Sequence, residues 1–162
     1  MKSDDSMFQI HKENNIFTDI QRKDLLNKSQ PFIQFMPGFP ARQTKADLHY
    51  SPSLRLYFQI IYEKIRRISN LNLEIVKAWV NEDCGRKEDI YYHNHPTADY
   101  SCVYYIKTLP YFNSGTLFKD YGFVRAKQNS LIIFPSNLVH GTPSYPFPFI
   151  KRYTLAIDLN IR

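Results

Sequence analysis

From residue 70 onward, the chain is a series of short apolar or alternating runs separated by turn residues. The runs are LNLEIVKAWVN, DIYYHNH, YSCVYYIK, GTLFKDY, NSLIIFP and KRYTLAIDLNI, and Gly, Pro, Asn or Asp lies between most of them. The 12 Tyr and 12 Phe of the chain also favour strands, since aromatic side chains suit a pleated, half-buried surface. Short strands at this spacing predict a mainly β fold, a barrel of about seven or eight strands.

Two helices are predicted ahead of this barrel. Residues 17–27 form the first, with a cap near Thr18. Residues 52–69 form the second, because Ser51 can cap it and Pro52 suits a first turn. Apolar residues recur along the second helix at three- and four-residue steps, which gives it one apolar face. These residues are Leu54, Tyr57, Ile61, Ile65 and Ile68.

The length of 162 residues fits one domain, 1–162, in which residues 1–70 form a helical layer outside a β core of residues 71–162. Two cysteines, Cys84 and Cys102, are too few for a disulfide scaffold. No stretch approaches the roughly 20 apolar residues that cross a bilayer, and the N-terminus has no apolar run of signal-peptide length. We therefore expect a soluble protein in a reducing, cytoplasmic setting, without a membrane partner.

The formal net charge of +6 suits an anionic partner. However, the Lys and Arg residues are spread along the chain, and the densest local group is Lys64, Arg66 and Arg67. This distribution does not predict a nucleic-acid-binding surface. An anionic co-substrate would benefit from the positive field equally well. We expect a small-molecule or peptide substrate, whose identity the sequence does not indicate, and no oligomeric state is predicted.

Three of the five histidines, His93, His95 and His140, form a pattern typical of a metal site. His93 and His95 are two residues apart, so on a strand both side chains point to the same face. Imidazole suits divalent iron, copper, zinc and nickel, and such a pair brings two nitrogens within reach of one ion. His140 follows His93 by 47 residues (140 minus 93), and Gly141 leaves space beside it. A double-stranded β-helix, the jelly-roll or cupin-like barrel, joins an early pair to a late histidine in this way.

The final run, KRYTLAIDLNI, carries a second feature. Strand alternation places Arg152, Thr154, Ala156 and Asp158 on one face and apolar residues on the other. A buried Arg with a hydroxyl two residues further on can hold a carboxylate in a bidentate grip. A dicarboxylate co-substrate needs such an anchor when its 2-oxo acid end chelates a metal. The run therefore predicts a carboxylate-binding site.

Both features have a plainer alternative. A histidine taken alone is more often a polar residue on an exposed strand or in a loop, and Arg152 could be an edge-strand residue paired with a surface acid. The tyrosines near the histidine pair are similarly more often core residues than pocket residues. The occurrence of both features in one chain favours the site over these alternatives.

Several motifs in this part of the chain also occur in the order and spacing of a known group. They are AWVNEDCG, HNHPTADYSCVYYIK, SGTLF, LIIFPSNLVHGTPSY and RYTLAIDLNI. With them, the chain resembles the small 2-oxoglutarate–iron(II) oxygenases found in bacteria and phages. Their sequences look like W-x-N, H-x-H-P, S-G-V-Y-Y-V, F-P-S-x-L-x-H and R-x-S/T-x-A-x-N. The resemblance covers about residues 70–162.

The resemblance implies an oxygenase that uses Fe(II) and takes 2-oxoglutarate as co-substrate. It implies that His93 and His140 are metal ligands and that Arg152 binds the distal carboxylate of 2-oxoglutarate. By the same resemblance Thr154 assists Arg152, and Tyr104, in the strand after the metal pair, faces the co-substrate. If the chain is encoded by a phage, its setting is the host cytoplasm.

The chain departs from the group's usual pattern at Cys102, and at His95 both the chain and the group's H-x-H-P form differ from the common iron site. Cys102 stands where the pattern usually has Gly, which would narrow the pocket or place a thiol near it. The third metal ligand is His95, whereas the common iron site has two histidines and a carboxylate, so Asp99 is the alternative. Ser101 and Asn137 are further candidates for polar contacts in the substrate pocket.

Three functions remain open at this point. The first is a 2-oxoglutarate-dependent hydroxylase, in which binding of 2-oxoglutarate depends on Arg152. The second is a three-histidine, cupin-like metal dioxygenase that does not use 2-oxoglutarate. The third is a non-catalytic β-barrel binding module without a metal. Residues 31–50, which are rich in aromatic residues, are a candidate lid over the barrel.

Overall fold

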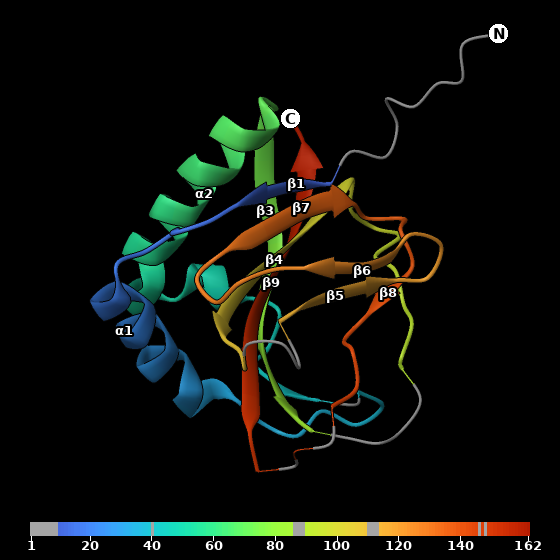
Figure 1. Ribbon diagram of the computed structural model, residues 1–162. Coiled ribbons are helices and arrows are strands. Elements are labelled where there is room, and N and C mark those ends of the chain that lie inside the picture. The colour runs from blue at the N-terminus through green and yellow to red at the C-terminus, as the bar shows by residue number, and fades with distance from the viewer. Residues whose placement is uncertain (1–9, 40, 86–89, 110–113, 146, 148) are drawn as a thin grey trace, which may run out of the picture.

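The computed structural model describes residues 10–39, 41–85, 90–109, 114–145, 147 and 149–162, which form two antiparallel β-sheets and two α-helices (Figure 1). The larger sheet has the order β1 (His11–Glu13), β7 (Leu131–Pro135), β4 (Tyr100–Lys107), β9 (Lys151–Ile161), β3 (Leu73–Cys84), β2 (Arg42–Gln43). The smaller sheet has the order β6 (Gly122–Arg125), β5 (Gly115–Phe118), β8 (His140–Gly141). The prediction of a mainly β, double-stranded β-helix fold is confirmed.

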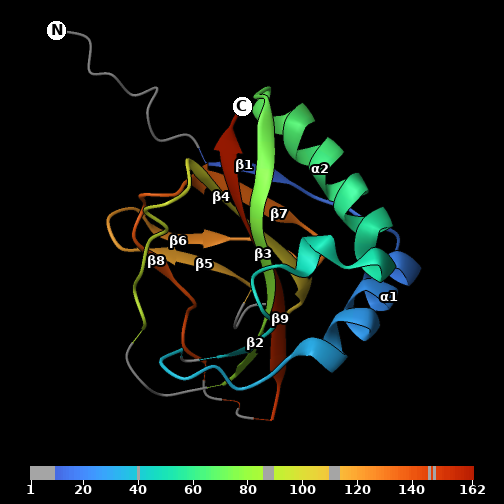
Figure 2. The same cartoon turned by 180° about the vertical axis from the view of Figure 1, so that it is seen from behind.

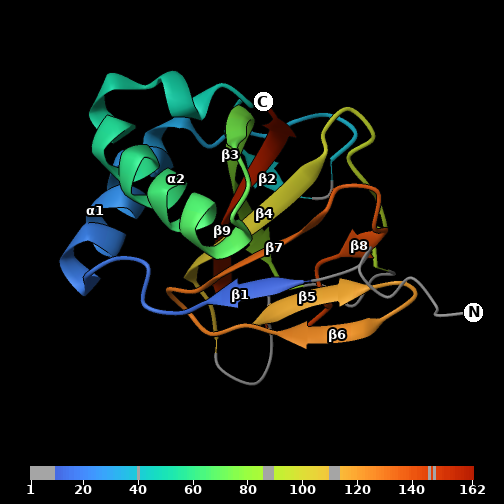
Figure 3. The same ribbon diagram turned by 90° about the horizontal axis from the view of Figure 1, so that it is seen from above.

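The two helices cover the face of the larger sheet that points away from the smaller sheet (Figures 2 and 3). Helix α1 (Asp19–Ser29) begins with a capping box in which Thr18 and Gln21 each bond the backbone of the other. Helix α2 (Arg55–Ser69) follows a 3-10 turn at Pro52–Leu54, so the predicted helix over 52–69 is found with a tighter first turn. The same N-terminal part of the chain also supplies β1 and β2 to the larger sheet.

The apolar face of α2 and the outer face of the sheet form the main core. Leu54, Ile61 and Ile65 are fully buried in it, together with alternate residues of the central strands. These strand residues are Cys102, Tyr104 and Ile106 of β4 and Tyr153, Leu155, Ile157 and Leu159 of β9. Because side chains alternate along a strand, the residues between them face the space between the two sheets.

The space between the sheets is filled at one end and hollow at the other. A small second core of Tyr105, Phe118, Ala126, Ile132, Phe134 and Leu138 fills the first end. The hollow end is lined by the inward residues of β3 and β9 and by the loops around β8. Polar residues on the inward face of β9 are therefore placed beside a cavity instead of a core.

One predicted strand is absent from the described residues, since DIYYHNH forms no strand in the part that the structure describes, residues 90–95. Within this segment, His93 forms a single antiparallel bridge with His140. None of the helices in the described part of the chain is long and apolar enough to cross a membrane.

Candidate metal centre and carboxylate pocket

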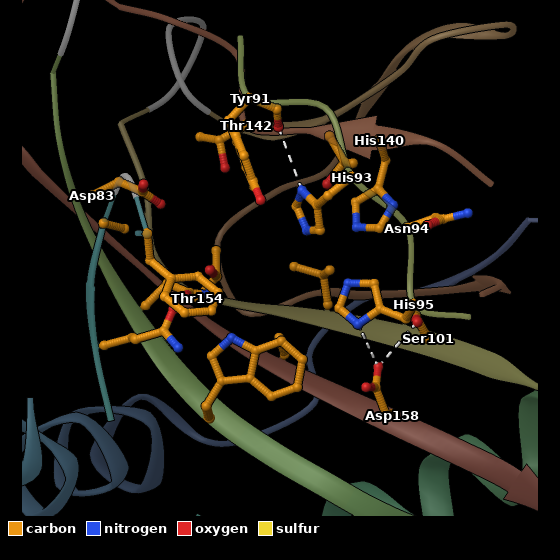
Figure 4. A pocket seen from close by; sticks show the side chains of 18 of the residues that line it. Asp83, Tyr91, His93, Asn94, His95, Ser101, His140, Thr142, Thr154 and Asp158 are labelled. Atoms are coloured by element: carbon orange, nitrogen blue, oxygen red, sulfur yellow. Dashed lines mark hydrogen bonds and ion pairs between the residues drawn. The ribbon is translucent and has the colours of Figure 1, made fainter. Parts of the chain in front are cut away.

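The hollow between the sheets is a cavity of about 400 Å³. Residues from β3, β4 and β9, from the segment before β4 and from both sides of β8 line it (Figure 4). Phe39, Ala41, Gln43 and Ala46 of the candidate lid border it as well, while a movement of that segment stays a prediction. The three histidines and Arg152 all contribute to this one cavity.

Backbone pairing brings the three histidines together. The N–H of His93 donates to the carbonyl of His140 at 3.0 Å, and the N–H of His140 donates to the carbonyl of His93 at 2.9 Å. The N–H of His95 donates to the carbonyl of Ser136 at 2.9 Å. One ring nitrogen from each histidine lies within 4.8 Å of those of the other two, which is close enough for one ion to bind all three.

The partners of the ring nitrogens determine which nitrogen is free in each histidine. Nδ1 of His140 lies 2.8 Å from the carbonyl of Leu138, and Nδ1 of His93 lies 3.4 Å from that of Tyr91. Nδ1 of His95 lies 2.9 Å from Oδ1 of Asp158. Carbonyl and carboxylate oxygens accept, so Nδ1 carries the proton and Nε2 keeps its lone pair. Metal-bound histidines usually have such an acceptor on the second nitrogen, so the residues present fit a metal ion.

Burial favours the neutral form of two of these imidazoles, His140 and His93. Burial in the cavity wall, with smaller contributions from the neighbouring His93 and His95, lowers the pKa of His140 to about 3. Burial also lowers the pKa of His93 below its ordinary value, and nearby His95 adds to the effect. A metal binds the neutral form of histidine, so His93 and His140 are in the form that binds a metal at neutral pH.

These pKa shifts predict that the metal-free protein loses stability in acid. An unfolded His140 would keep a pKa near 6.5, so the unfolded chain takes up a proton below that pH while the folded chain does not. The free energy of unfolding should therefore fall between about pH 6.5 and pH 3, by at most about 1.4 kcal/mol per pH unit from this residue. Urea unfolding of the metal-free protein at several pH values measures this, and His140→Phe should flatten the dependence. An unchanged slope in that variant would contradict the assignment.

Arg152 lies in the same cavity with an incompletely bonded guanidinium. Its side chain is 2% exposed, and Nη2 donates to the carbonyl of Gly115 at 2.9 Å. Among the described residues, neither Nε nor Nη1 has a hydrogen-bond partner. The guanidinium also lies 5.5 Å from the ring centroid of Tyr105. An unpaired buried charge is costly, and a carboxylate ligand would remove that cost.

Gly115 holds the carbonyl that Arg152 contacts. Its φ of +146° is one that side chains disfavour, and a Cβ there would lie 2.3 Å from the carbonyl oxygen of Val124 and 2.6 Å from the ring of Phe123. A glycine is therefore needed where β5 approaches β6 so closely. Thr154, the next inward residue of β9, is buried and borders the cavity beside Arg152.

Strand parity places the side chains of two predicted pocket residues, Tyr104 and Cys102, in the outer core of the larger sheet. Tyr104 lies on the outer face of β4, where its hydroxyl donates to Oδ1 of Asn129 at 2.8 Å and its ring packs on Phe17. It cannot face a co-substrate in the cavity from there. Cys102 is fully buried and packs in the same outer core, although part of the residue borders the cavity. Ser101 has the opposite parity on β4 and does face the cavity.

The alternative ligand Asp99 is also turned away from the histidines. It is exposed, and its Oδ2 accepts from the backbone N–H of Ile161 at 2.8 Å. The cluster of close ligand atoms in the described residues contains the three histidines without it. Asn137 is exposed in the turn between β7 and β8 and is not one of the described residues that line the cavity.

Several cavity residues contact the histidines although the sequence analysis gave them no role in the site. Asp158 contacts His95 and Tyr91 contacts His93 (Figure 4). The single Trp of the chain, Trp79, stacks on His95 with ring centroids 5.5 Å apart. Trp79, Asn81 and Asp83 share the inward face of β3. The sequence feature that could have identified the three β3 residues is the alternation of side chains within AWVNEDCG, because that strand pairs with the final strand, whose inward face was predicted.

Comparison with known proteins was made by sequence and by structure. No family model and no curated protein matches the sequence. HygX from Streptomyces hygroscopicus, in a structure with nickel and 2-oxoglutarate bound, has a TM-score of 0.69 at 12% identity over 96% of this chain and 84% of its own. A Pseudomonas putida prolyl-4-hydroxylase has a TM-score of 0.68 at 13% identity over 97% and 95%.

A third match is the viral collagen prolyl hydroxylase of Paramecium Bursaria Chlorella virus-1, in complex with 2-oxoglutarate. It has a TM-score of 0.65 at 12% identity and covers 94% of this chain and 96% of its own. Similarity at this level of identity concerns the fold, and it extends over nearly the whole chain. The chain therefore has the double-stranded β-helix fold of the 2-oxoglutarate–iron(II) oxygenases.

Proposed function

We propose that the protein is an Fe(II)- and 2-oxoglutarate-dependent dioxygenase that hydroxylates a small-molecule or peptide substrate. The observation that carries the proposal is the incompletely bonded guanidinium of Arg152, whose Nε and Nη1 have no partner among the described residues, in the same cavity as a three-histidine cluster. A metal chelator with a distal carboxylate would satisfy both features at once. The structural similarity to proteins with bound 2-oxoglutarate supports the same ligand.

Each group in the cavity would have a defined task. The Nε2 atoms of His93, His95 and His140 would hold the metal ion. Arg152 would bind the distal carboxylate of 2-oxoglutarate through Nε and Nη1, and the neighbouring Thr154 would donate to the same carboxylate. Iron supplies the activation of O₂, with 2-oxoglutarate oxidised to succinate and CO₂ while one oxygen atom enters the substrate.

The walls of the cavity would orient the reactants and exclude water. Phe134 packs edge-on against His140 with ring centroids 4.8 Å apart, and Trp79 stacks on His95. Tyr91 stacks on His93 and is 49% exposed, so it lies at the opening of the site. Apolar and aromatic walls lower the local dielectric, which strengthens the grip of Arg152 on a carboxylate.

A second candidate is a three-histidine metal dioxygenase that does not use 2-oxoglutarate. The observation in its favour is that the cluster of close ligand atoms in the described residues contains no carboxylate. The common iron site of 2-oxoglutarate oxygenases has two histidines and one carboxylate. This candidate leaves Nε and Nη1 of Arg152 without a ligand, which is why we place it second.

Titration of the Fe(II) protein with 2-oxoglutarate, without oxygen, tests the proposal. We expect a weak metal-to-ligand charge-transfer band in the visible, because the 2-oxo acid end would chelate iron. Pyruvate is a matched control, since it has the same chelating end but no distal carboxylate to reach Arg152, and it should bind much more weakly. Bound iron without a band would favour the three-histidine dioxygenase. Absence of bound iron would favour a non-catalytic binding module.

A further inference from the structure

Asp158 is a buried carboxylate that the proposed function does not use. It lies on the inward face of β9, is 3% exposed, and pairs in register with Ser101 of β4. Its Oδ1 lies 2.9 Å from Nδ1 of His95 and accepts from Oγ of Ser101 at 3.2 Å (Figure 4). Two neighbouring strands of the larger sheet therefore hold this carboxylate in one position beside His95.

The ring of His95 is contacted by other rings in addition to the contact of its Nδ1 with Asp158. Trp79 stacks on it with an interplanar angle of 18°, and His140 stacks with ring centroids 5.3 Å apart at 13°. The stacking partners therefore fix the plane of the His95 ring, and Asp158 is the acceptor for its Nδ1. With Nδ1 protonated toward Asp158, the lone pair of Nε2 is the one available to an ion.

The charges of the site also differ from those of the common iron centre. Two histidines and a carboxylate lower the charge of a divalent ion by one, whereas three neutral histidines do not lower it. Asp158 is placed to supply that negative charge from behind His95. It is not placed to bind the ion itself, because Asp158 contacts Nδ1 of His95, and Nε2 is the nitrogen left for the ion.

We propose that Asp158 is a positioning residue that fixes His95 with Nε2 toward the metal and supplies, through the His95 ring, the negative charge that a ligand carboxylate supplies elsewhere. The inference rests on the proposed metal centre but not on 2-oxoglutarate. A carboxylate behind a metal-bound histidine raises the basicity of the ligand nitrogen, and loss of such a partner typically costs about 10- to 100-fold in metal affinity.

Cobalt(II) affinity, measured without 2-oxoglutarate, tests this role. The single Trp of the chain stacks on His95, so quenching of Trp79 fluorescence reports binding. Asp158→Asn keeps an acceptor for His95 but removes the charge, and we expect its affinity to fall about 10- to 100-fold. Glu82→Gln is the matched control, because Glu82 is a buried carboxylate that contacts Tyr153 and Arg42 away from the histidines, and it should bind cobalt like the wild type. An Asp158→Asn affinity within twofold of the wild type would overturn the proposal.

Proton NMR of the cobalt(II) wild type gives a second readout that does not depend on a variant folding. Each histidine bound through Nε2 should show one paramagnetically shifted, solvent-exchangeable Nδ1–H signal, three in all. The His95 signal should exchange slowly, because Asp158 accepts its proton. Absence of a slowly exchanging signal assigned to His95 would mean that His95 is not bound through Nε2, which overturns the role of Asp158. Wild-type protein that binds no cobalt would instead remove the metal centre itself, whereas a failed 2-oxoglutarate titration would leave this inference standing.

Discussion

Replacing Arg152 with methionine is expected to weaken 2-oxoglutarate binding by about 1.5 to 3.5 orders of magnitude, and to leave the ligand-free protein at least as stable as the wild type. The first effect follows from the loss of a buried, charge-assisted pair, which is typically worth about 2 to 5 kcal/mol. No other described cation in the cavity lining is buried as Arg152 is, since Lys77 is exposed. The distal carboxylate would therefore have no substitute partner at that end.

The second effect follows from the cost of the guanidinium before the ligand arrives. Nε and Nη1 are buried without a partner among the described residues, and only Nη2 is bonded, to the carbonyl of Gly115. Replacing a poorly paired buried charge by an apolar side chain of similar volume is often neutral or stabilising. An opposite change of stability and binding in one variant is typical of a ligand site and is not expected of a structural arginine.

Calorimetric titration of the nickel(II) protein with 2-oxoglutarate, together with thermal unfolding with and without the ligand, measures both effects. Arg22→Met is the matched control. Arg22 is also buried, but it lies in α1 and donates to Asp19 and to the carbonyl of Ile106 of β4, away from the cavity. The control should lose stability and keep its affinity for 2-oxoglutarate. An Arg152→Met protein that binds 2-oxoglutarate as the wild type does would refute the role of Arg152 as the anchor.

The parts of the fold that the sequence predicted are those with a strong local signal. The run KRYTLAIDLNI alternates without interruption and forms β9 (Lys151–Ile161) over the predicted residues. Helix α2 has a single apolar face and ends at Ser69 as predicted, with Asn70 in the left-handed conformation after it. In both elements local periodicity and tertiary burial agree, so neither overrides the other.

The parts that were missed depend on contacts between distant residues. The run YSCVYYIK is apolar on both faces, so its alternation could not show that Ser101 faces the cavity and Tyr104 the helices. The link between Asp158 and His95 exists only because β4 and β9 pair in one register. The segment before β4 was predicted to be a strand. Instead, the backbone groups of His93 and His95 form hydrogen bonds with those of His140 and Ser136. The spacing of residues in the sequence can identify candidate site residues, but it does not show which distant residues they contact.

Replacing His140 with alanine should reduce metal affinity by more than the roughly 10- to 100-fold that loss of an outer partner costs, because a ligand atom itself is removed. His140 is the most buried of the three histidines, at 5% exposure, and its Nδ1 is fixed by the carbonyl of Leu138. Phe134 and Phe118 pack around its ring. The ring cannot turn away, so it presents Nε2 to the cavity in one direction.

Equilibrium titration with cobalt(II) or iron(II), with the bound metal counted after desalting, measures the loss. His49→Phe is the matched control, since both ring nitrogens of His49 are also buried and have no partner among the described residues, but it lies under the helices and does not belong to the cluster. The control should bind metal like the wild type, and His140→Ala should also lose the 2-oxoglutarate band, because chelation needs the ion. Metal affinity within tenfold of the wild type in His140→Ala would mean that the ion is held elsewhere. The oxygenase proposal would then lose its metal centre, while the carboxylate site at Arg152 would remain and would have to serve a binding module.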